Sequence, residues 1–442
     1  MTALAIGFMN SSSGLSWLEL QDAGMLPGML GSDWQMRSGS EAKLEETAVI
    51  SLRGSLVELQ AVTDRLEALR SSAAGRPDLC LRVWSETRQS YLYSPLKAFN
   101  WQVLPVHPRS ADAGSFSIKL NWERENFFYG DELPVPLSNT SGSGLVSGIT
   151  LYNHDDAAIG HDNWFDVNLQ EIGNLWPLPL RVEVKNTTSG EPLADFWLGS
   201  MCLPDSGVLP NLVFEAESGL GGTVLTDASA SSGAYCRYDW SGSGWHSLAS
   251  WTISVLDVTR LQGIGLLPLL RFFNAPVEAD LRLRWELLVD GVPVWLGPAS
   301  ELELGQASLR MEPLHIPLAD LPLGSFAMGH QLVLQAFHVG SGVHRLELDD
   351  FLFLPQQTFG AYHAISNLKQ NASLIDDQMR QAVWSESGGL ALTTHLRVGA
   401  GHHLQSGSLQ RFYCFQREAN GAAPISRTVS VKAWYRPGWR LP

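Results

Sequence analysis

Apolar and polar residues alternate in short runs along most of this chain, and this alternation predicts β-strands. In the run 281–285, Leu-Arg-Leu-Arg-Trp, every second residue is apolar, as on a strand with one buried face. Clusters of Gly, Pro, Asp and Asn separate such runs at nearly regular intervals. The pattern predicts strands over residues 47–52, 79–84, 90–93, 99–106, 115–122, 147–153, 164–169, 180–186, 196–200, 211–217, 235–238, 249–255, 266–274, 280–288, 309–316, 331–338, 344–354, 411–417 and 428–435.

One segment has the helical period instead. Its apolar residues recur every three or four positions and so fall on one face: Leu56, Leu59, Val62, Leu66 and Leu69. Ser55 in front of them, with Glu58 three residues later, has the pattern of a capping box. The sequence Gly75-Arg76-Pro77 is a helix stop signal. We therefore predict one amphipathic helix that lies against a sheet.

Composition supports a mainly β fold of several units. The chain has 442 residues, enough for two or three domains, and its 41 Gly and 23 Pro suit short elements joined by turns. We predict a barrel-like β domain with one helix over residues 1–139 and a large β-sandwich, or jelly roll, over 145–355. The small polar stretch 138–144 is the predicted linker. Residues 356–442 form a C-terminal β segment, which either completes an earlier sheet or packs back against the first domain.

The charge balance excludes one class of function. Thirty basic against 45 acidic residues give a net charge of −15, so a broad basic surface for nucleic-acid phosphates is not expected, nor is sequence-specific nucleic-acid binding. The segment 409–442 differs in sign, with six basic residues and one acidic residue, and would suit an acidic neighbour or a solvated edge. No run of 18 apolar residues occurs, so membrane insertion is not expected.

The start of the chain and its cysteines bear on location. Residues 1–9 lack the charged and apolar regions of a secretory signal, which favours a protein made in a reducing cytoplasm. The four cysteines, Cys80, Cys202, Cys236 and Cys414, are far apart and form no Cys-x-x-Cys pair. We expect them to be buried free thiols.

Motifs that carry chemistry are scarce. The chain has no Gly-x-Ser-x-Gly, Walker loop, His-Glu-x-x-His or paired Cys/His spacing, so no catalytic residue, cofactor or resident metal is expected. His154-Asp155-Asp156 with His161-Asp162-Asn163 could hold a divalent ion, but such residues are common in polar loops, which is the prediction here; His402-His403 is a weaker case of the same kind.

Two pairs of carboxylates are candidates for glycosidic acid–base chemistry. Asp349 and Asp350 adjoin each other in a predicted strand, and Glu215 and Glu217 flank Ala216 near a strand start. Glycosidases need two carboxylates across one cleft, and nothing in the sequence brings these together across one. A structural role in turns is therefore the favoured interpretation.

Tryptophans in a Gly/Ser-rich stretch offer a binding role. Trp240 and Trp245 could stack on sugar rings or contact a partner, or could fill the rim of a sandwich core, and the sequence leaves both readings open. Trp251 falls in a strand pattern and is expected in the core. Trp240 and Trp245 are thus the candidate contact residues for a glycan or partner.

Three segments carry a first resemblance. They are Phe214-Glu215-Ala216-Glu217, the stretch 230–235 (Ala-Ser-Ser-Gly-Ala-Tyr) and the stretch 348–354 (Leu-Asp-Asp-Phe-Leu-Phe-Leu). Together they resemble the jelly-roll frame of carbohydrate-binding modules. The resemblance implies a jelly roll, and it matches Glu215 and Glu217 to the start of that frame, which often holds a structural calcium ion.

The layout as a whole carries a second resemblance. Its pieces are the helix 56–69, the stretches 94–101 and 118–122, and the later segments 173–180 and 198–199. A strand–helix–strand unit with a meander, followed by a large sandwich, resembles the distal tail or baseplate-hub proteins of tailed bacteriophages. In those folds the first unit is a split barrel that forms a ring with its neighbours. The resemblance therefore implies a split-barrel-like N-terminal domain.

These resemblances lead to two functional expectations. The first is a non-enzymatic structural protein of a phage tail tip, assembled in the host cytoplasm. It would form a ring of six or three copies and contact other tail proteins, such as tube, hub or fibre, and a host-surface glycan. The net charge of −15 suits a ring whose acidic lumen repels DNA phosphates. The alternative is a carbohydrate-binding protein, or an accessory domain of a polysaccharide-active protein. A secreted binder would need an export signal, so the tail-tip expectation ranks first. A glycoside hydrolase ranks last, because no catalytic carboxylate pair can be argued from the sequence.

Overall fold

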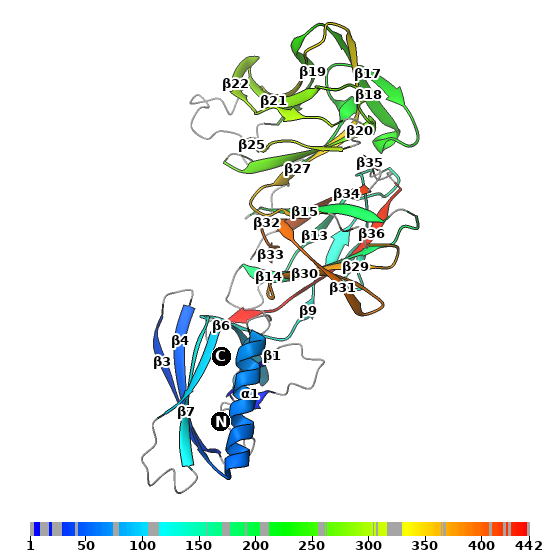
Figure 1. The fold of residues 1–442 in the computed structure, drawn as a ribbon. Coiled ribbons are helices and arrows are strands. Elements are labelled where there is room, and N and C mark those ends of the chain that lie inside the picture. The colour runs from blue at the N-terminus through cyan, green and yellow to red at the C-terminus, as the bar shows by residue number, and fades with distance from the viewer. Residues whose placement is uncertain are drawn as a thin grey trace.

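The chain folds into three β-rich units stacked end to end, with one helix beside the first of them (Figure 1). We call them the base unit (β1–β8, α1 and β37), the middle sandwich (β9–β15 and β28–β36) and the outer sandwich (β16–β27). The predicted mainly β fold is confirmed. This computed structural model describes residues 4–8, 17–19, 29–39, 43–73, 79–104, 115–156, 158–169, 177–190, 192–203, 212–254, 261, 263–303, 305, 308–315, 329–363, 365, 368–405, 409–418, 421–422 and 426–439. Within them, no helix is long and apolar enough to cross a membrane.

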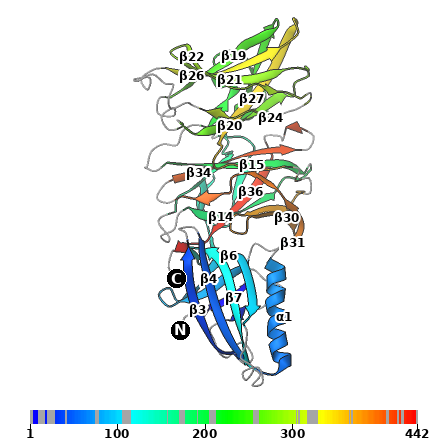
Figure 2. The ribbon, with the colours of Figure 1, turned by 60° about the vertical axis from the view of Figure 1, so that its left-hand side comes forward.

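The base unit is a half-barrel sheet with a helix packed against it (Figure 2). Its strand order is β2-β1-β5-β6-β7-β4-β3, with β8 paired to β6 and β37 paired to β8, and every pairing is antiparallel. The elements are β1 (Leu4–Phe8), β2 (Leu18–Glu19), β3 (Met29–Gly39), β4 (Lys43–Arg53), α1 (Leu56–Ala73), β5 (Leu79–Ser85), β6 (Ser90–Val103), β7 (Ser115–Glu125), β8 (Phe128–Tyr129) and β37 (Gly438–Trp439).

The predicted amphipathic helix is confirmed as α1. The side chains of Leu59, Val62, Leu66 and Leu69 are all buried and join the core of the base sheet. The capping box also forms, because the Ser55 backbone N–H donates to Glu58 Oε2 at 2.8 Å and the Glu58 N–H donates to Ser55 Oγ at 3.4 Å. The stop signal at 75–77 lies outside the described residues.

Replacing Ser55 by alanine is expected to cost about 1 kcal/mol of stability in the base unit, since it leaves an N–H group of the first helical turn without its acceptor. Urea denaturation and amide hydrogen exchange over 56–62 would measure the loss. Ser71→Ala, at the other end of the same helix, is the control and should be near neutral. An equal effect of both substitutions would contradict a specific role for the cap.

The middle sandwich consists of two eight-stranded sheets. One has the order β11-β10-β13-β34-β15-β28-β32 with β35 attached, and the other β12-β36-β14-β29-β30-β31 with β9 and β33 attached. The strands are β9 (Leu133–Pro134), β10 (Leu137–Asn139), β11 (Gly142–Leu145), β12 (Ile149–Tyr152), β13 (Trp164–Val167), β14 (Leu178–Asn186), β15 (Leu193–Leu203), β28 (Gly360–Tyr362), β29 (Ser373–Asp377), β30 (Ala382–Ser387), β31 (Leu390–His395), β32 (Arg397–Gly399), β33 (His403–Leu404), β34 (Leu409–Glu418), β35 (Gly421–Ala422) and β36 (Thr428–Tyr435).

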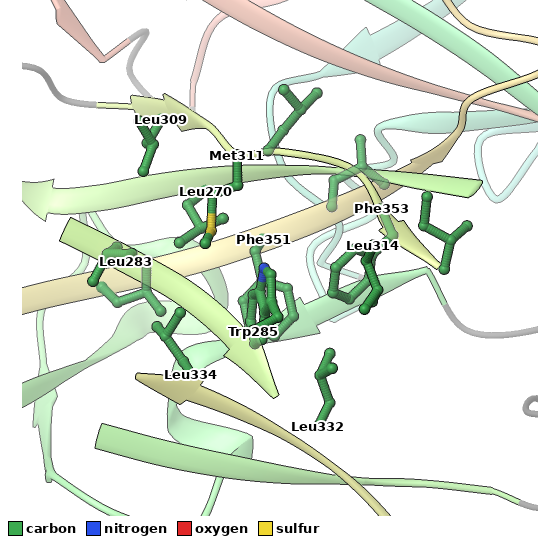
Figure 3. Packing of buried hydrophobic residues seen from close by; sticks show 14 of the residues in the cluster. Leu270, Leu283, Trp285, Leu309, Met311, Leu314, Leu332, Leu334, Phe351 and Phe353 are labelled. Carbon is green, nitrogen blue, oxygen red and sulfur yellow. The ribbon is translucent and has the colours of Figure 1, made fainter. Parts of the chain in front are cut away.

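The outer sandwich has a seven-stranded sheet, β17-β18-β27-β20-β24 with β16 and β25 attached, and a five-stranded sheet, β19-β26-β21-β22 with β23 attached. Trp285 and Phe351 meet in its core with ring centroids 5.2 Å apart (Figure 3). The elements are β16 (Val213–Glu215), η1 (Ala216–Ser218), β17 (Thr223–Thr226), η2 (Ser231–Gly233), β18 (Ala234–Ser241), β19 (Gly244–Ile253), β20 (Gly265–Asn274), β21 (Arg282–Val289), β22 (Val292–Leu296), β23 (Ser300–Glu301), β24 (Ser308–Arg310), β25 (Leu314–His315), β26 (His330–His338) and β27 (Val343–Pro355).

The sheets divide the chain differently from the predicted 145–355 unit. Strands from before and after the outer sandwich interleave in the middle one: β34 lies between β13 and β15, and β36 lies between β12 and β14. The outer sandwich alone is continuous, from β16 to β27. The physical reason is that the edges of β12–β15 are completed by strands that come late in the sequence, which alternation within a run does not reveal.

The stretch 138–144 is not a linker, and that prediction is corrected. It forms the β10–β11 hairpin, with Asn139 paired to Gly142. Asp162 holds the turn, because its Oδ2 accepts from the Thr140 N–H at 3.1 Å. Small polar residues such as Thr140 and Ser141 serve a tight turn as well as a linker. Gly144, at φ +67°, lies within β11, where the register of the hairpin shifts.

The chain leaves the base unit once and returns to it once. It leaves between β8 and β9 and returns between β36 and β37, where the Gly130 N–H donates to the Pro437 carbonyl at 2.8 Å. Trp439 then packs against Gly130 and lies under the Arg88 guanidinium, 4.4 Å from the ring centroid. The two sandwiches are therefore built from one continuous segment of the chain, inserted between β8 and β37 of the base sheet.

Candidate functional site

Four carboxylates gather on the outer sandwich where β16 meets β27. Glu215 ends β16 and lies directly opposite Asp350 of β27 in the antiparallel register. Asp349 precedes Asp350, and Glu217 lies in the short η1 turn that follows β16. The register of β16 on β27 brings the two carboxylate pairs together, which no pattern in the sequence indicates.

Hydrogen bonds hold part of this cluster. The Ser231 hydroxyl donates to Glu215 Oε1 at 2.9 Å, and the Ser231 backbone N–H donates to Asp349 Oδ1 at 2.8 Å. Ser231 itself is fully buried at the start of η2. Among the described residues, three carboxylate oxygens of the cluster are buried without a hydrogen-bond partner: Glu215 Oε2, Glu217 Oε2 and Asp350 Oδ1. These oxygens lack the hydrogen bonds that burial demands.

Arg271 of β20 supplies the positive charge of the cluster. Its Nε lies 3.4 Å from Asp350 Oδ1, and both side chains are only 4% exposed. Its Nη2 donates to the Asn153 carbonyl of the middle sandwich, and its guanidinium lies 5.7 Å from the Phe415 ring centroid. Arg271 therefore links the acidic cluster to the junction of the two sandwiches, where Phe415 also joins the outer core.

One arginine does not balance four carboxylates. Burial, with the negative charges of Asp350 and Glu217 nearby, raises the pKa of Glu215 to about 9. Burial and the charge of Asp350 raise the pKa of Asp349 to about 7. Burial likewise raises the pKa of Asp350, although Arg271 opposes the rise. At neutral pH, a bound cation or bound protons are needed to offset the buried negative charge of this cluster.

The donor set suits a hard cation such as Ca²⁺, which takes carboxylate and carbonyl oxygens. Glu215 and Glu217, the pair implied by the resemblance to carbohydrate-binding modules, would hold it together with Asp350, and its charge would offset the buried negative charge. The three carboxylate oxygens without a hydrogen-bond partner are the observation that favours this fit. Such an ion would tie β16 and η1 to β27, which is a structural role.

The two candidate tryptophans do not form a shared platform. Trp240 lies on β18 and Trp245 on β19, in different sheets. Trp240 is only 9% exposed and belongs to the outer core, so its ring is covered. Trp245 is half-buried, with Phe337 beside it and the Arg284 guanidinium 3.8 Å from its centroid. Trp251 is in the core, as expected.

The His/Asp loop between β12 and β13 is an ordered structural loop. His161 stacks on Tyr152 with centroids 3.6 Å apart, and its Nδ1 lies 3.1 Å from His154 Nε2. Trp164 Nε1 donates to Asp155 Oδ1 at 3.1 Å. The residues lie in a loop, as predicted, but the expectation that this loop is solvated is wrong for His154, Asp162 and Asn163, which are buried. His402 is buried and its Nε2 lies 2.8 Å from the Tyr362 hydroxyl.

The cysteine prediction is confirmed for three of the four thiols. All four are free; Cys80, Cys236 and Cys414 are buried and Cys202 is half-buried. Burial raises the pKa of the Cys414 thiol to about 12, so it stays protonated and unreactive.

The base sheet has a second polar feature, on the face opposite its core. Glu45 and Glu123 pair across β4 and β7, and Thr47 and Asn121 form the next pair, with Thr47 Oγ1 donating to Asn121 Oδ1 at 3.1 Å. Asn100 of β6 continues the same row. These residues line a hollow of about 250 Å³. The face is polar and carries charges of both signs, since Lys43 and Lys119 occupy register positions on the same side of β4 and β7 as the two glutamates. The other side of the strands is mostly apolar.

Comparisons with known proteins identify no family. No family model matches the chain, and no curated protein matches it. Among solved structures, the phage p2 baseplate in its activated conformation is 11% identical, with a TM-score of 0.24 over 44% of this chain and 72% of that one. The infectious bursal disease virus Gt strain is 12% identical, with a TM-score of 0.18 over 59% and 66%. An exo-β-1,3-galactanase from Phanerochaete chrysosporium is 10% identical, with a TM-score of 0.19 over 76% and 86%.

These resemblances are weak. The matched structures are a phage baseplate, a virus and a galactanase, and TM-scores of this size carry no argument about function.

Proposed function

We propose that this chain is a non-enzymatic structural subunit of a phage tail tip, a distal tail or baseplate-hub protein. Its base units would join edge to edge into a ring, and its two sandwiches would project from that ring as an arm. The observation that carries the proposal is the base sheet, which is curved and open at both ends of its strand order. Other tail proteins, and a host-surface glycan at the arm, are the proposed partners.

The open edges support self-association. β3 is 11 residues long and pairs with β4 on one side; no other described strand pairs with it. β2 ends the same sheet on the opposite side. Unpaired strand edges pair readily with strands of other chains. When one edge of each subunit pairs with the opposite edge of the next subunit, and the same rotation relates all neighbours, the subunits close into a ring.

The polar face of the base sheet supports a conduit. Glu45 and Glu123 lie on the face that α1 does not cover, together with Thr47, Asn100 and Asn121. In a ring with its helices outward, this face would line the opening. The two carboxylates would repel DNA phosphates, although Lys43 and Lys119 on the same face reduce its net negative charge.

The insertion of both sandwiches at one place in the base unit supports the proposal that they form an arm. Both connections between base unit and sandwiches occur at one place, around Gly130 and Pro437, so the remainder of the chain extends away from the base (Figure 1). The alternative, a carbohydrate-binding protein, has less support, because the ring of Trp240 is buried and one face of Trp245 is covered by Arg284.

We expect the purified full chain to form closed rings, of six or three copies, when examined by mass photometry and negative-stain imaging. Lysines at two positions of the edge strand, Asp33→Lys with Gln35→Lys, should convert the rings to folded monomers, because edge lysines oppose strand pairing. Leu390→Lys on β31, an edge of the middle sandwich, is the control and should leave the rings intact. Monomers of the unaltered chain from nanomolar to high micromolar concentration would refute the proposal.

A further inference from the structure

Three metal-ligand side chains converge at one end of the outer sandwich, where the chain crosses between its two sheets. Residues 275–281 connect β20 to β21, and residues 339–342 connect β26 to β27. Glu278 lies in the first connection, His338 ends β26 and His344 is the second residue of β27. Each sheet thus contributes one histidine, and the crossover contributes the carboxylate (Figure 2 shows both sheets in the top tier).

The ligand atoms face one another. Glu278 Oε2 lies 2.6 Å from His344 Nδ1 and 3.8 Å from His338 Nε2. Within the described part of the chain, this is the group of three or more His, Cys, Asp or Glu residues whose ligand atoms all lie within 4.8 Å of one another. The four carboxylates around Glu215 are more widely spread. Ligand atoms of one tetrahedral zinc ion lie about 3.3 Å apart, and the observed distances bracket that value.

Backbone groups orient the cluster from outside. The Arg345 N–H donates to Glu278 Oε1 at 3.1 Å, which directs the other oxygen, Oε2, at the two imidazoles. The Ala279 carbonyl oxygen lies 3.0 Å from His338 Nε2 and is a fourth ligand atom beside the group. Hydrogen bonds of this kind outside the ligands are what fix a metal site before the ion arrives.

Gly340 makes room for the first histidine. A Cβ at this position would lie 2.9 Å from His338 Cε1 and 3.0 Å from its Nδ1, closer than side-chain carbons approach. A side chain at position 340 would therefore require the His338 ring to shift from this position. This connection places the His338 and His344 rings with centroids 3.9 Å apart.

We propose that Glu278, His338 and His344 bind one divalent transition-metal ion, best represented by Zn²⁺, and that the ion pins the two sheets of the outer sandwich together at this end. Two imidazole nitrogens and one carboxylate oxygen form a common zinc ligand set, and the Ala279 carbonyl or a water would complete four-coordination. The side chains of Glu278 and His338 are 23% and 15% exposed, so the ion can enter from solvent.

Binding has a consequence for one hydrogen bond. His338 Nδ1 accepts from the Gly340 N–H at 2.8 Å, so the proton of the neutral ring is on Nε2. Coordination through Nε2 moves that proton to Nδ1, which can then no longer accept from Gly340. Metal binding would therefore break the Gly340–His338 hydrogen bond and replace it with metal–ligand bonds to both sheets. As a result, the Gly340 amide hydrogen should exchange with solvent faster in the metal-bound state.

The test is calorimetric titration of the untagged full chain, dialysed against EDTA and then against metal-free buffer, with ZnSO₄ near pH 7.5. We expect one Zn²⁺ to bind per chain, with the affinity weakened about tenfold or more by each of Glu278→Gln, His338→Gln and His344→Gln. Zn²⁺ should also raise the melting temperature of the unaltered chain but not of these variants. Hydrogen-exchange mass spectrometry over 337–344 reports on the Gly340 amide.

His363→Gln is the matched control, since His363 faces a single carboxylate, Asp195, at 3.4 Å and should leave the titration unchanged. CaCl₂ in place of ZnSO₄ should give no heat that depends on the three residues, because Ca²⁺ avoids imidazole. The proposal fails if no Zn²⁺ binds. It also fails if binding persists in all three variants, for then the ion is held elsewhere. Metal-free melting temperatures of the variants close to that of the unaltered chain separate lost binding from lost folding.

Discussion

Replacing Arg124 by methionine is expected to destabilise the base unit by about 3–5 kcal/mol, the usual cost of removing one partner of a buried ion pair. The guanidinium donates to both Glu46 oxygens, with Nε to Oε2 at 2.7 Å and Nη2 to Oε1 at 2.8 Å. Both residues are almost fully buried, at 3% and 1% exposure. Without Arg124, the Glu46 carboxylate would keep only the 2.8 Å hydrogen bond from Trp122 Nε1 in a core of apolar side chains.

The proper comparison is with an exposed pair and with the double replacement. Arg282 and Glu301 form an ion pair at 2.9 Å whose side chains are 46% and 74% exposed, so Arg282→Met should cost about 1 kcal/mol or less. Adding Glu46→Leu to Arg124→Met should recover part of the loss, since no unpaired charge then stays buried. Urea denaturation, with hydrogen exchange over β4 and β7 to assign the transition to the base unit, measures each case. Equal costs for Arg124→Met and Arg282→Met would show that burial does not govern these pairs.

Local elements were predictable because their causes are local. The helix follows from a period and a capping box within one segment, and Ser55 and Glu58 make those contacts with each other. Strand alternation is equally local: β14 and β36 both alternate between buried and half-buried residues along their length. The partner of a strand, in contrast, does not follow from the local sequence. Ile149 pairs with Val431 of β36, and the alternation of either strand would suit many neighbours.

Because strand partners are not visible in the local sequence, the predicted domain boundaries also differ from those of the observed sheets. The stretch 138–144 has the composition of a linker and of a hairpin turn, and only its contact with Asp162 distinguishes them. The outer sandwich is inserted between β15 and β28, which lie side by side in one sheet of the middle sandwich, with Trp197 paired to Ala361. Adjacent strands that are distant in sequence leave no mark on the composition of the segment between them.

The candidate sites show how far a sequence can be read. The resemblance to carbohydrate-binding modules indicated Glu215 and Glu217, but Asp350 joins them only through the pairing of β16 with β27. His338 and His344 flank a Val-Gly-Ser-Gly turn, a signal that could have placed them beside each other at the end of two strands. Nothing in the sequence around Glu278 indicates that it lies between them. Trp240 and Trp245 were open between core and surface, and the separation of β18 and β19 into two sheets decides where each lies.

Without divalent ions, the stability of the outer sandwich is expected to fall as the pH rises from about 5 to about 9, and Ca²⁺ should abolish most of that fall. Glu215 has a pKa of about 9 in the fold against an ordinary value of 4.5, and Asp349 about 7 against 3.8. The folded state therefore holds protons that the unfolded state has released. Its stability is complete below the unfolded pKa values and is lost as the pH rises through the folded ones, at up to about 1.4 kcal/mol per pH unit for each carboxyl.

Calcium and neutralising substitutions should act on this loss in the same direction, because both remove buried negative charge. We expect millimolar CaCl₂ to raise the melting temperature more at pH 8 than at pH 5, in parallel thermal denaturations of EDTA-treated protein. Glu215→Gln and Glu217→Gln should flatten the pH profile and weaken the response to Ca²⁺. Glu301→Gln, whose side chain is 74% exposed, should change neither. A metal-free stability that is constant or rises between pH 5 and pH 8 would mean that the carboxylates are compensated by groups other than a cation or protons, since Arg271 alone offsets only one of the four charges.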